Sequence, residues 1–252
     1  MTAGIAAFID HFQDYRDQYV LIGGTACDLL LNEAGESFRP TKDIDLVLIV
    51  EAMTTEFARA FWEFIDDGGY EARQKSSGKP EFYRFINPKH AEYPAMLELF
   101  ARPDSKVDFS YHGHLVPLHI DDELSSLSAI LLNDSYYRFL LNGRTVSSGV
   151  SVLDAEHLVP MKMKAWLDLS EKKSLGFHVN DRDLRKHRQD VFRLFPLISN
   201  DTLILTPLDV LRDIDRFIAS VRSLPFETSQ IGIDISKRDI LDIYSRIYVP
   251  ES

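Results

Sequence analysis

Cysteine, long apolar runs and a surplus of positive charge are scarce or missing in this chain. Its 252 residues include one cysteine, Cys27, which excludes an internal disulfide. No run of 18 apolar residues is present, so we expect no membrane span. The first residues lack the basic start and the long apolar core of a secretory signal peptide. Together these absences predict a cytoplasmic protein.

Negative charge outweighs positive charge. The chain has 28 Lys and Arg against 39 Asp and Glu, which gives a formal net charge of −11. A protein that coats nucleic acid needs positive charge on its binding face, so we expect no broad nucleic-acid-binding surface. A local basic groove is still compatible with this balance, and an acidic surface suits a basic protein partner.

What the chain does have is a pair of apolar runs near its N-terminus. Tyr19–Ile22 predicts a buried strand that ends in a tight turn at Gly23-Gly24. A helix is predicted over Ala26–Leu31, with Thr25 close to its start. Ile44–Val50 is almost continuously apolar, which is typical of a strand covered on both faces.

Two carboxylates stand at the start of the second run. Asp43 and Asp45 are two positions apart, and side chains with that spacing share one face of a strand, about 6.6 Å apart along it. Carboxylate oxygens are the ligands that hard cations prefer. The pair therefore predicts a divalent cation site at the open end of a buried strand.

The glycines and the carboxylates form one composite motif. It resembles the nucleotidyltransferase-fold superfamily, that of polymerase β, and more closely the AbiEii-like abortive-infection toxins of type IV toxin–antitoxin systems. The shared pattern is an apolar strand, then GG[TS]A, a spacer and R-x-[ST]-x-D-I-D. The residues that carry it here are Gly23, Gly24, Thr25, Arg39, Thr41, Asp43 and Asp45.

Two weaker stretches extend the resemblance. One is a strand over Pro94–Arg102 with a third carboxylate, Glu98; the other is a lysine-bearing helix, LVPMKMKAW, followed by a helix with Lys186-His187-Arg188-Gln189-Asp190. The sequence departs from the family at the third carboxylate, where Asp is frequent. After the lysine, the family often has an arginine where this chain has Asp168-Leu-Ser-Glu.

The resemblance implies transfer of a nucleoside monophosphate from an NTP to an acceptor, with two Mg²⁺ ions. It implies that Gly23, Gly24, Thr25, Arg39 and Thr41 bind the nucleotide. It also implies that Asp43 and Asp45 bind the metals, that Glu98 binds the second metal and activates the acceptor hydroxyl, and that Lys162 touches the phosphates.

General chemistry supports such roles. Phosphoryl transfer is assisted by two cations about 3.5–4 Å apart, and Mg²⁺ keeps several waters, so two or three carboxylates suffice. A Gly-Gly step at a helix N-terminus lets backbone N–H groups approach phosphate oxygens.

Several residues keep a second interpretation. Asp108 is a rival for the third carboxylate, and Lys162 and Lys164 fit the wet side of an amphipathic helix. A structural role is favoured for Lys186, His187 and Asp190. Surface positions are favoured for His112, His114 and His119 over a zinc site. The segment Arg73–Lys79 fits a solvated tip better than an RNA or nucleotide contact.

The whole chain predicts an α/β (α+β) protein with two domains. Residues 1–152 form a nucleotidyltransferase-type mixed β-sheet with flanking helices, and residues 153–252 form a mostly helical C-terminal domain. Further helices are predicted over Gly4–Asp17, Met53–Ile65, Ala155–Leu169, Asp181–Leu197, Leu208–Leu224 and Ser236–Ile247, and further strands within Tyr70–Phe85 and at Leu115–Ile120. Asn142-Gly143 predicts the turn of a hairpin over Ser135–Val150.

Three functions remain open on this evidence. The first is a toxin that transfers a nucleotide to tRNA or protein and is neutralised by a cognate basic antitoxin. The second is an antibiotic-modifying nucleotidyltransferase, whose helical domain would form an acidic pocket for a cationic small molecule. The third is a nucleotide-binding regulatory module without catalysis, against which the intact Asp43 and Asp45 pair weighs.

Overall fold

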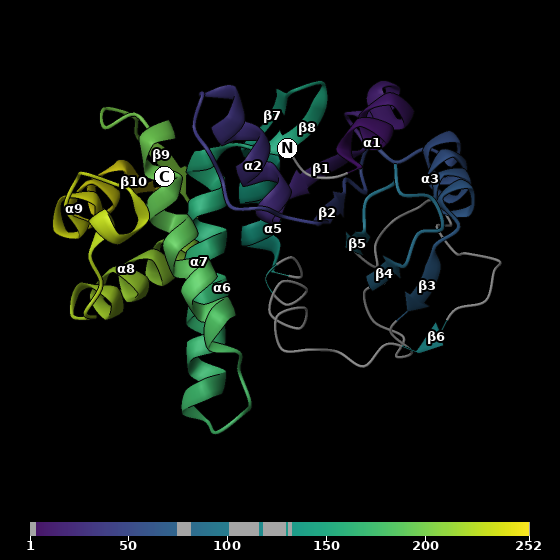
Figure 1. Ribbon diagram of the computed structural model, residues 1–252. Coiled ribbons are helices and arrows are strands. Elements are labelled where there is room, and N and C mark those ends of the chain that lie inside the picture. The colour runs from purple at the N-terminus through teal and green to yellow at the C-terminus, as the bar shows by residue number, and fades with distance from the viewer. Residues whose placement is uncertain (1–3, 75–81, 101–115, 118–129, 131–132, 252) are drawn as a thin grey trace. The chain divides into compact units, whose positions relative to one another are not determined.

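A computed structural model describes residues 4–74, 82–100, 116–117, 130 and 133–251 (Figure 1). The chain divides into two compact units. Unit 1 comprises residues 1–120 and 144–154, and unit 2 comprises residues 121–143 and 155–252. The predicted boundary at residue 152 stays a prediction; unit 2 takes up residues 121–143 in addition to the C-terminal helices.

Unit 1 is built on a mixed sheet of eight described strands in the order β6-β3-β4-β5-β2-β1-β8-β7. The strands are β1 (Tyr19–Ile22), β2 (Asp43–Leu48), β3 (Glu71–Gln74), β4 (Phe82–Ile86), β5 (Met96–Phe100), β6 (Val116–Pro117), β7 (Arg144–Ser147) and β8 (Val150–Leu153). Central β2 runs antiparallel to β1 and parallel to β5. The predicted mixed α/β fold with flanking helices is thereby confirmed.

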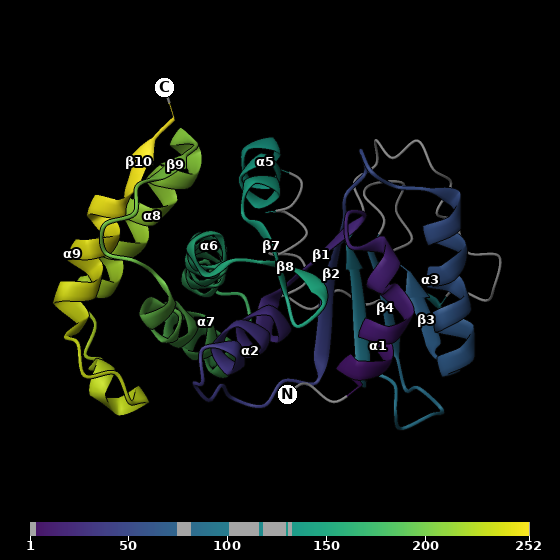
Figure 2. The same cartoon turned by 90° about the horizontal axis from the view of Figure 1, so that it is seen from above.

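Helices cover both sides of the central strands. Figure 2 shows α2 (Gly23–Glu33) on one side of β1 and β2, with α1 (Ile5–Phe12) and α3 (Thr55–Gly68) on the other. A short 3-10 turn, η1 (Gln13–Tyr15), follows α1. All four residues of β1 are buried, as a strand covered on both faces requires.

An aromatic core joins α1 and α3 to the sheet. The ring of Phe12 lies 5.2 Å from Phe64 and 6.2 Å from Tyr19 between centroids, and Phe61 lies 5.6 Å from Phe85 of β4. Such tilted and edge-on aromatic pairs add to the energy of apolar burial. The sheet face toward α3 is therefore apolar, which leaves polar chemistry to the other face.

Unit 2 is mostly helical, as predicted. It contains α5 (Asp134–Asn142), α6 (Ala155–Ser174), α7 (Asp181–Arg193), α8 (Leu208–Arg222) and α9 (Lys237–Ile247), with 3-10 turns η2 (Phe195–Leu197) and η3 (Thr228–Ile231). Helix α6 packs against α7 and α8, and α9 packs against α8. A two-stranded parallel sheet of β9 (Ile204–Thr206) and β10 (Tyr248–Pro250) was not predicted.

The predicted hairpin over Ser135–Val150 is wrong. Residues up to Asn142 form α5, and the hairpin of β7 and β8 begins only after Gly143 and turns at Ser148-Gly149. Gly143 is the C-terminal cap of α5, and the imidazole of His157 occupies the space that a Cβ atom there would need. The glycine thus serves close packing and not a two-residue turn.

The other strand and helix predictions agree with the structure within a few residues where the structure describes them. Residues 101–102 of the predicted strand Pro94–Arg102 and residues 115 and 118–120 of Leu115–Ile120 lie outside the described residues. The N-terminal cap of α3 is Thr54, whose hydroxyl accepts a hydrogen bond from Phe57 N–H, and Gly69 ends the helix in the left-handed region. Among the described helices, none has the length and apolar character needed to cross a membrane.

Candidate active site

The site begins where β1 passes directly into α2. Gly23 is the first residue of that helix and has a φ of 69°, so the predicted tight turn is replaced by an immediate strand-to-helix step. Asp45 lies close to it, because Ile22, the residue before Gly23, pairs with Asp45 in the antiparallel register. A Cβ atom at Gly23 would overlap Oδ2 of Asp45. The glycine is therefore what lets this carboxylate lie against the start of the helix.

Gly24 meets the other half of the motif. A Cβ atom there would lie 2.8 Å from Oγ1 of Thr41 and 3.5 Å from a guanidinium nitrogen of Arg39. The guanidinium of Arg39 also lies over the ring of Phe38, 4.8 Å from its centroid. Residues from two separate stretches of sequence thus meet at the first turn of α2, as the motif predicts.

Thr25 has a different position from its neighbours. It is fully buried, and its hydroxyl donates a hydrogen bond of 2.6 Å to the carbonyl oxygen of Asp43. The threonine therefore ties the start of β2 to α2. Its predicted contact with the nucleotide stays a prediction.

Asp45 and Glu98 lie side by side on neighbouring strands. The parallel register of β2 and β5 pairs Asp45 with Glu98 and Asp43 with Met96. Asp43 and Asp45 are half-buried, whereas Glu98 is 8% exposed. Burial raises the pKa of the Glu98 carboxyl well above its usual range, and the charge and hydrogen bond of the Asp45 carboxyl raise it further.

Arg84 of β4 is a member of this site that the sequence interpretation missed. Its Nε donates to Oε1 of Glu98 at 2.8 Å, and its Nη2 lies 2.7 Å from the same oxygen. The guanidinium works against the rise in the Glu98 pKa. One signal was available: Arg84 is a lone charge within the otherwise apolar stretch FYRFI.

The donor set fits a magnesium ion in its chemistry. Asp43, Asp45 and Glu98 offer carboxylate oxygens, and a close pair of carboxylates favours a cation between them. Within the described residues, no group of three or more His, Cys, Asp and Glu side chains is arranged as a ready metal site. The assignment of these three residues as metal ligands stays a prediction.

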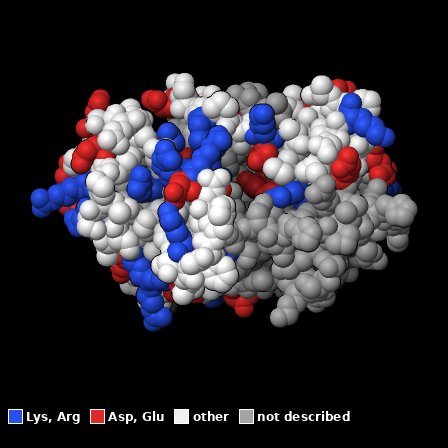
Figure 3. Space-filling view, turned by 60° about the horizontal axis from the view of Figure 1, so that its bottom comes forward, with Lys and Arg blue, Asp and Glu red and all other residues white. Residues whose placement is uncertain are grey.

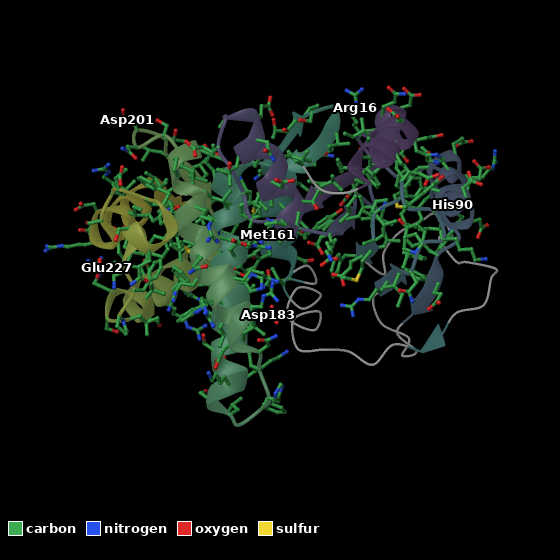
Figure 4. The ribbon with its side chains drawn as sticks, viewed as in Figure 1. Arg16, His90, Met161, Asp183, Asp201 and Glu227 are labelled. Carbon is green, nitrogen blue, oxygen red and sulfur yellow. The ribbon has the colours of Figure 1, made fainter. Side chains whose placement is uncertain are left out.

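Lys162 belongs to unit 2, on α6. It is 5% exposed, so the wet-side interpretation is wrong for this lysine. Its Nζ lies 3.3 Å from Oδ2 of Asp190 on α7, which is fully buried. Figure 4 labels Met161, its chain neighbour, on α6. His187 is buried as well, which agrees with the structural interpretation of the Lys186-to-Asp190 segment.

Four other candidates lie outside the described residues. They are Asp108, the rival third carboxylate, and the three histidines His112, His114 and His119. The tip of the segment Arg73–Lys79 lies outside them too.

Two solved structures resemble the chain weakly. An antigenic nucleotidyltransferase-like protein from Paracoccidioides brasiliensis is 16% identical, with a TM-score of 0.46 over 98% of this chain and 93% of that chain. A cytoplasmic RNA terminal U-transferase is 15% identical, with a TM-score of 0.30 over 81% of this chain and 53% of that chain. Neither likeness is close enough to carry an argument, and no curated protein sequence matches.

The family comparison is more informative. The model of the family described as "Nucleotidyl transferase AbiEii toxin, Type IV TA system" matches residues 8–215. This span includes the strand-to-helix glycines, the three carboxylates and the Lys162–Asp190 pair. The chain therefore belongs to the AbiEii family of nucleotidyltransferase toxins.

Proposed function

We propose that this protein transfers a nucleoside monophosphate from an NTP to a macromolecular acceptor, with Mg²⁺ as its metal, and acts as a toxin. The observation that carries the proposal is the meeting of Gly23 with Asp45 at the β1-to-α2 step, next to Glu98. A phosphate-binding helix start and a carboxylate cluster then lie side by side, as nucleotidyl transfer requires.

The nucleotide phosphates would bind at the first turn of α2. Its first N–H groups have no partner within the helix, and the helix dipole favours an anion there. Gly23 and Gly24 have no side chains to keep phosphate oxygens away from these groups. Arg39 and Thr41, which flank Gly24, would add a guanidinium and a hydroxyl as donors.

The carboxylates would hold the metal. Asp43, Asp45 and Glu98 are the residues that would bind it, and a bound Mg²⁺ would neutralise phosphate charge as the bond to the leaving pyrophosphate breaks. Glu98 would also take the proton of the acceptor hydroxyl. The phosphate contact predicted for Lys162 is kept as part of this proposal.

The class of acceptor is proposed from the positive charge on unit 2. Helix α7 carries Arg182, Arg185, Lys186, Arg188 and Arg193, although the whole chain is acidic. Figure 3 shows Lys and Arg side chains gathered over unit 2, on the left of the view. Such a surface suits an anionic macromolecule, and we propose tRNA or a protein as the acceptor. The excess of acidic residues suits a basic antitoxin.

The test is label transfer. Purified protein is incubated with each α-labelled NTP, Mg²⁺ and either total RNA or a cell lysate. We expect label in RNA or protein with at least one NTP. We also expect loss of that label in Asp45→Asn and no loss in Asp14→Asn, an exposed acid of the same unit. Expression of the wild type, but not of Asp45→Asn, should arrest growth.

Other outcomes reject the proposal in distinguishable ways. Label in a small-molecule product, with antibiotic resistance on expression, would identify the antibiotic-modifying alternative. NTP binding by calorimetry without turnover would identify the regulatory module. Label transfer that Asp45→Asn leaves unchanged would place the chemistry elsewhere.

A further inference from the structure

Arg84 connects to the carboxylate cluster from the strand beyond Glu98. The antiparallel register of β4 and β5 places Arg84 opposite Glu98, and two guanidinium nitrogens converge on one carboxylate oxygen at 2.7 and 2.8 Å. The two side chains are only 19% and 10% exposed. Because solvent is mostly excluded, the attraction between these charges is stronger than in a surface pair.

The alternation of β4 places Arg84 on the polar face of the sheet. Its neighbours Tyr83 and Phe85 are fully buried, and their rings contact Trp62 and Phe61 of α3. Successive side chains of a strand point to opposite faces, so Arg84 lies on the face away from α3. That face is the one that carries Glu98.

Glu98 lies between a cation and a second acid. Arg84 approaches it from one neighbouring strand and Asp45 from the other, and the Asp45 carboxyl is hydrogen-bonded to it. The carboxylate that Arg84 binds is also one that a divalent cation would use as a ligand, so the guanidinium and the cation compete for Glu98.

We propose that Arg84 is the resident counter-cation of Glu98. In the metal-free protein its guanidinium holds the Glu98 carboxylate in place and offsets the cost of burying its charge. When a divalent cation binds, it competes with Arg84 for Glu98 and takes over part of this neutralisation. Arg84 is thus a positioning residue that stabilises the empty site at the expense of metal affinity. This inference rests on the proposed function in one respect: the proposed function supplies the kind of cation, a divalent metal ion.

The test compares Arg84→Gln with Arg144→Gln. Arg144 is a matched control, since it is an exposed strand arginine of unit 1 whose guanidinium donates to a backbone carbonyl, that of Asp17, and not to a carboxylate of the described residues. Melting is followed by calorimetry in EDTA and in saturating Mn²⁺, and the Mn²⁺ dissociation constant is measured by electron paramagnetic resonance. Loss of Mn²⁺ binding in Asp45→Asn would show that the measured ion binds in this site.

In EDTA we expect Arg84→Gln to melt at least ~5 °C below the wild type, because the buried Glu98 carboxylate loses the cation that binds it. Saturating Mn²⁺ should close at least about half of this gap, since Mn²⁺ replaces the missing charge. The Mn²⁺ affinity of Arg84→Gln should be roughly threefold to tenfold higher than that of the wild type, because the competitor is gone. Arg144→Gln should match the wild type in all three measurements.

Two results would overturn the inference: a lower Mn²⁺ affinity in Arg84→Gln, or a melting gap that Mn²⁺ leaves unchanged. Absence of Mn²⁺ binding in the wild type would overturn it too. If Arg84→Gln does not fold in EDTA, Arg84→Lys replaces it; this variant keeps the charge but loses the two-pronged contact, and its Mn²⁺ affinity should again exceed that of the wild type. None of these readouts needs nucleotide transfer, so failure of label transfer alone rejects the proposed function and not this role of Arg84.

Discussion

The carboxylate of Asp45 occupies the space where a side chain at position 23 would have to lie. Gly23 leaves this space open and adopts a φ of 69°, which L-residues with a Cβ atom rarely adopt. The strand-to-helix step at Gly23 and the carboxylate of Asp45 therefore form one structural unit, because each occupies the room that the other leaves.

Gly23→Ala should separate this dependence from simple backbone strain when it is compared with Gly35→Ala. Gly35 has a similar φ of 80° with nothing within 4 Å of a built Cβ atom. Gly35→Ala should lose about 1–2 kcal/mol of stability and keep label transfer and Mn²⁺ binding. Gly23→Ala should lose more stability than Gly35→Ala. It should also lose label transfer and Mn²⁺ binding, because Asp45 must move. Urea unfolding and the two assays check this; equal behaviour of the two variants would contradict it.

Thr25→Val should weaken metal binding without removing any ligand. The valine keeps the buried shape of Thr25 but removes the hydroxyl that donates to the Asp43 carbonyl. Loss of this hydrogen bond costs about 0.5–1.5 kcal/mol, and the start of β2 loses its tie to α2. We expect lower stability and a lower Mn²⁺ affinity, whereas Thr25→Ser, which keeps the hydroxyl, should retain the affinity. A Thr25→Val variant with unchanged Mn²⁺ affinity would show that the tie does not position Asp43.

The central part of this site was predictable because its residues follow strong local patterns. Ile44–Val50 is apolar enough to be a covered strand, and the two-residue spacing of Asp43 and Asp45 puts them on one face. Glu98 was predicted on a strand, but its pairing with Asp45 depends on a parallel register that no local pattern specifies. Arg84 was missed for the same reason, since its partner is set by the ladder of β4 and β5.

Misread residues show where local patterns fail. Asn142-Gly143 has the composition of a hairpin turn, yet Gly143 is required by the ring of His157, fourteen positions later in the chain. Lys162 fits the polar side of an amphipathic helix, yet Asp190 of another helix makes its burial possible. In both cases a tertiary partner decided the outcome, and the sequence near the residue carries no trace of that partner.

Lys162→Met should destabilise unit 2 as well as affect catalysis. It leaves Asp190 fully buried without its lysine, although Arg193 stays 3.5 Å from it, and such a loss typically costs about 3–5 kcal/mol. Lys173→Met is the control on the same helix, because its partner Asp181 is exposed, and it should change stability little. Urea unfolding measures both.

The double variant Lys162→Met/Asp190→Leu separates folding from function. It replaces the buried charges by apolar groups, so it should regain most of the stability lost in Lys162→Met. Label transfer should stay absent, because the proposed phosphate contact is still missing. Restored transfer in the double variant would show that the lysine serves only the fold.

Pro160 lies inside α6, two positions before Lys162. Proline has no N–H, so Pro160 cannot donate the usual helical hydrogen bond to the carbonyl of Glu156. The hydroxyl of Tyr248, on β10, donates to that carbonyl instead at 2.7 Å.

Tyr248→Phe should therefore cost about 1–3 kcal/mol, since it leaves the carbonyl without this donor. In a Pro160→Ala background the alanine N–H restores the helical bond, and Tyr248→Phe should then cost less than half as much. Urea unfolding of the four proteins gives this coupling energy. Equal costs in the two backgrounds would mean that the Tyr248 hydroxyl does not substitute for the helical N–H that Pro160 lacks.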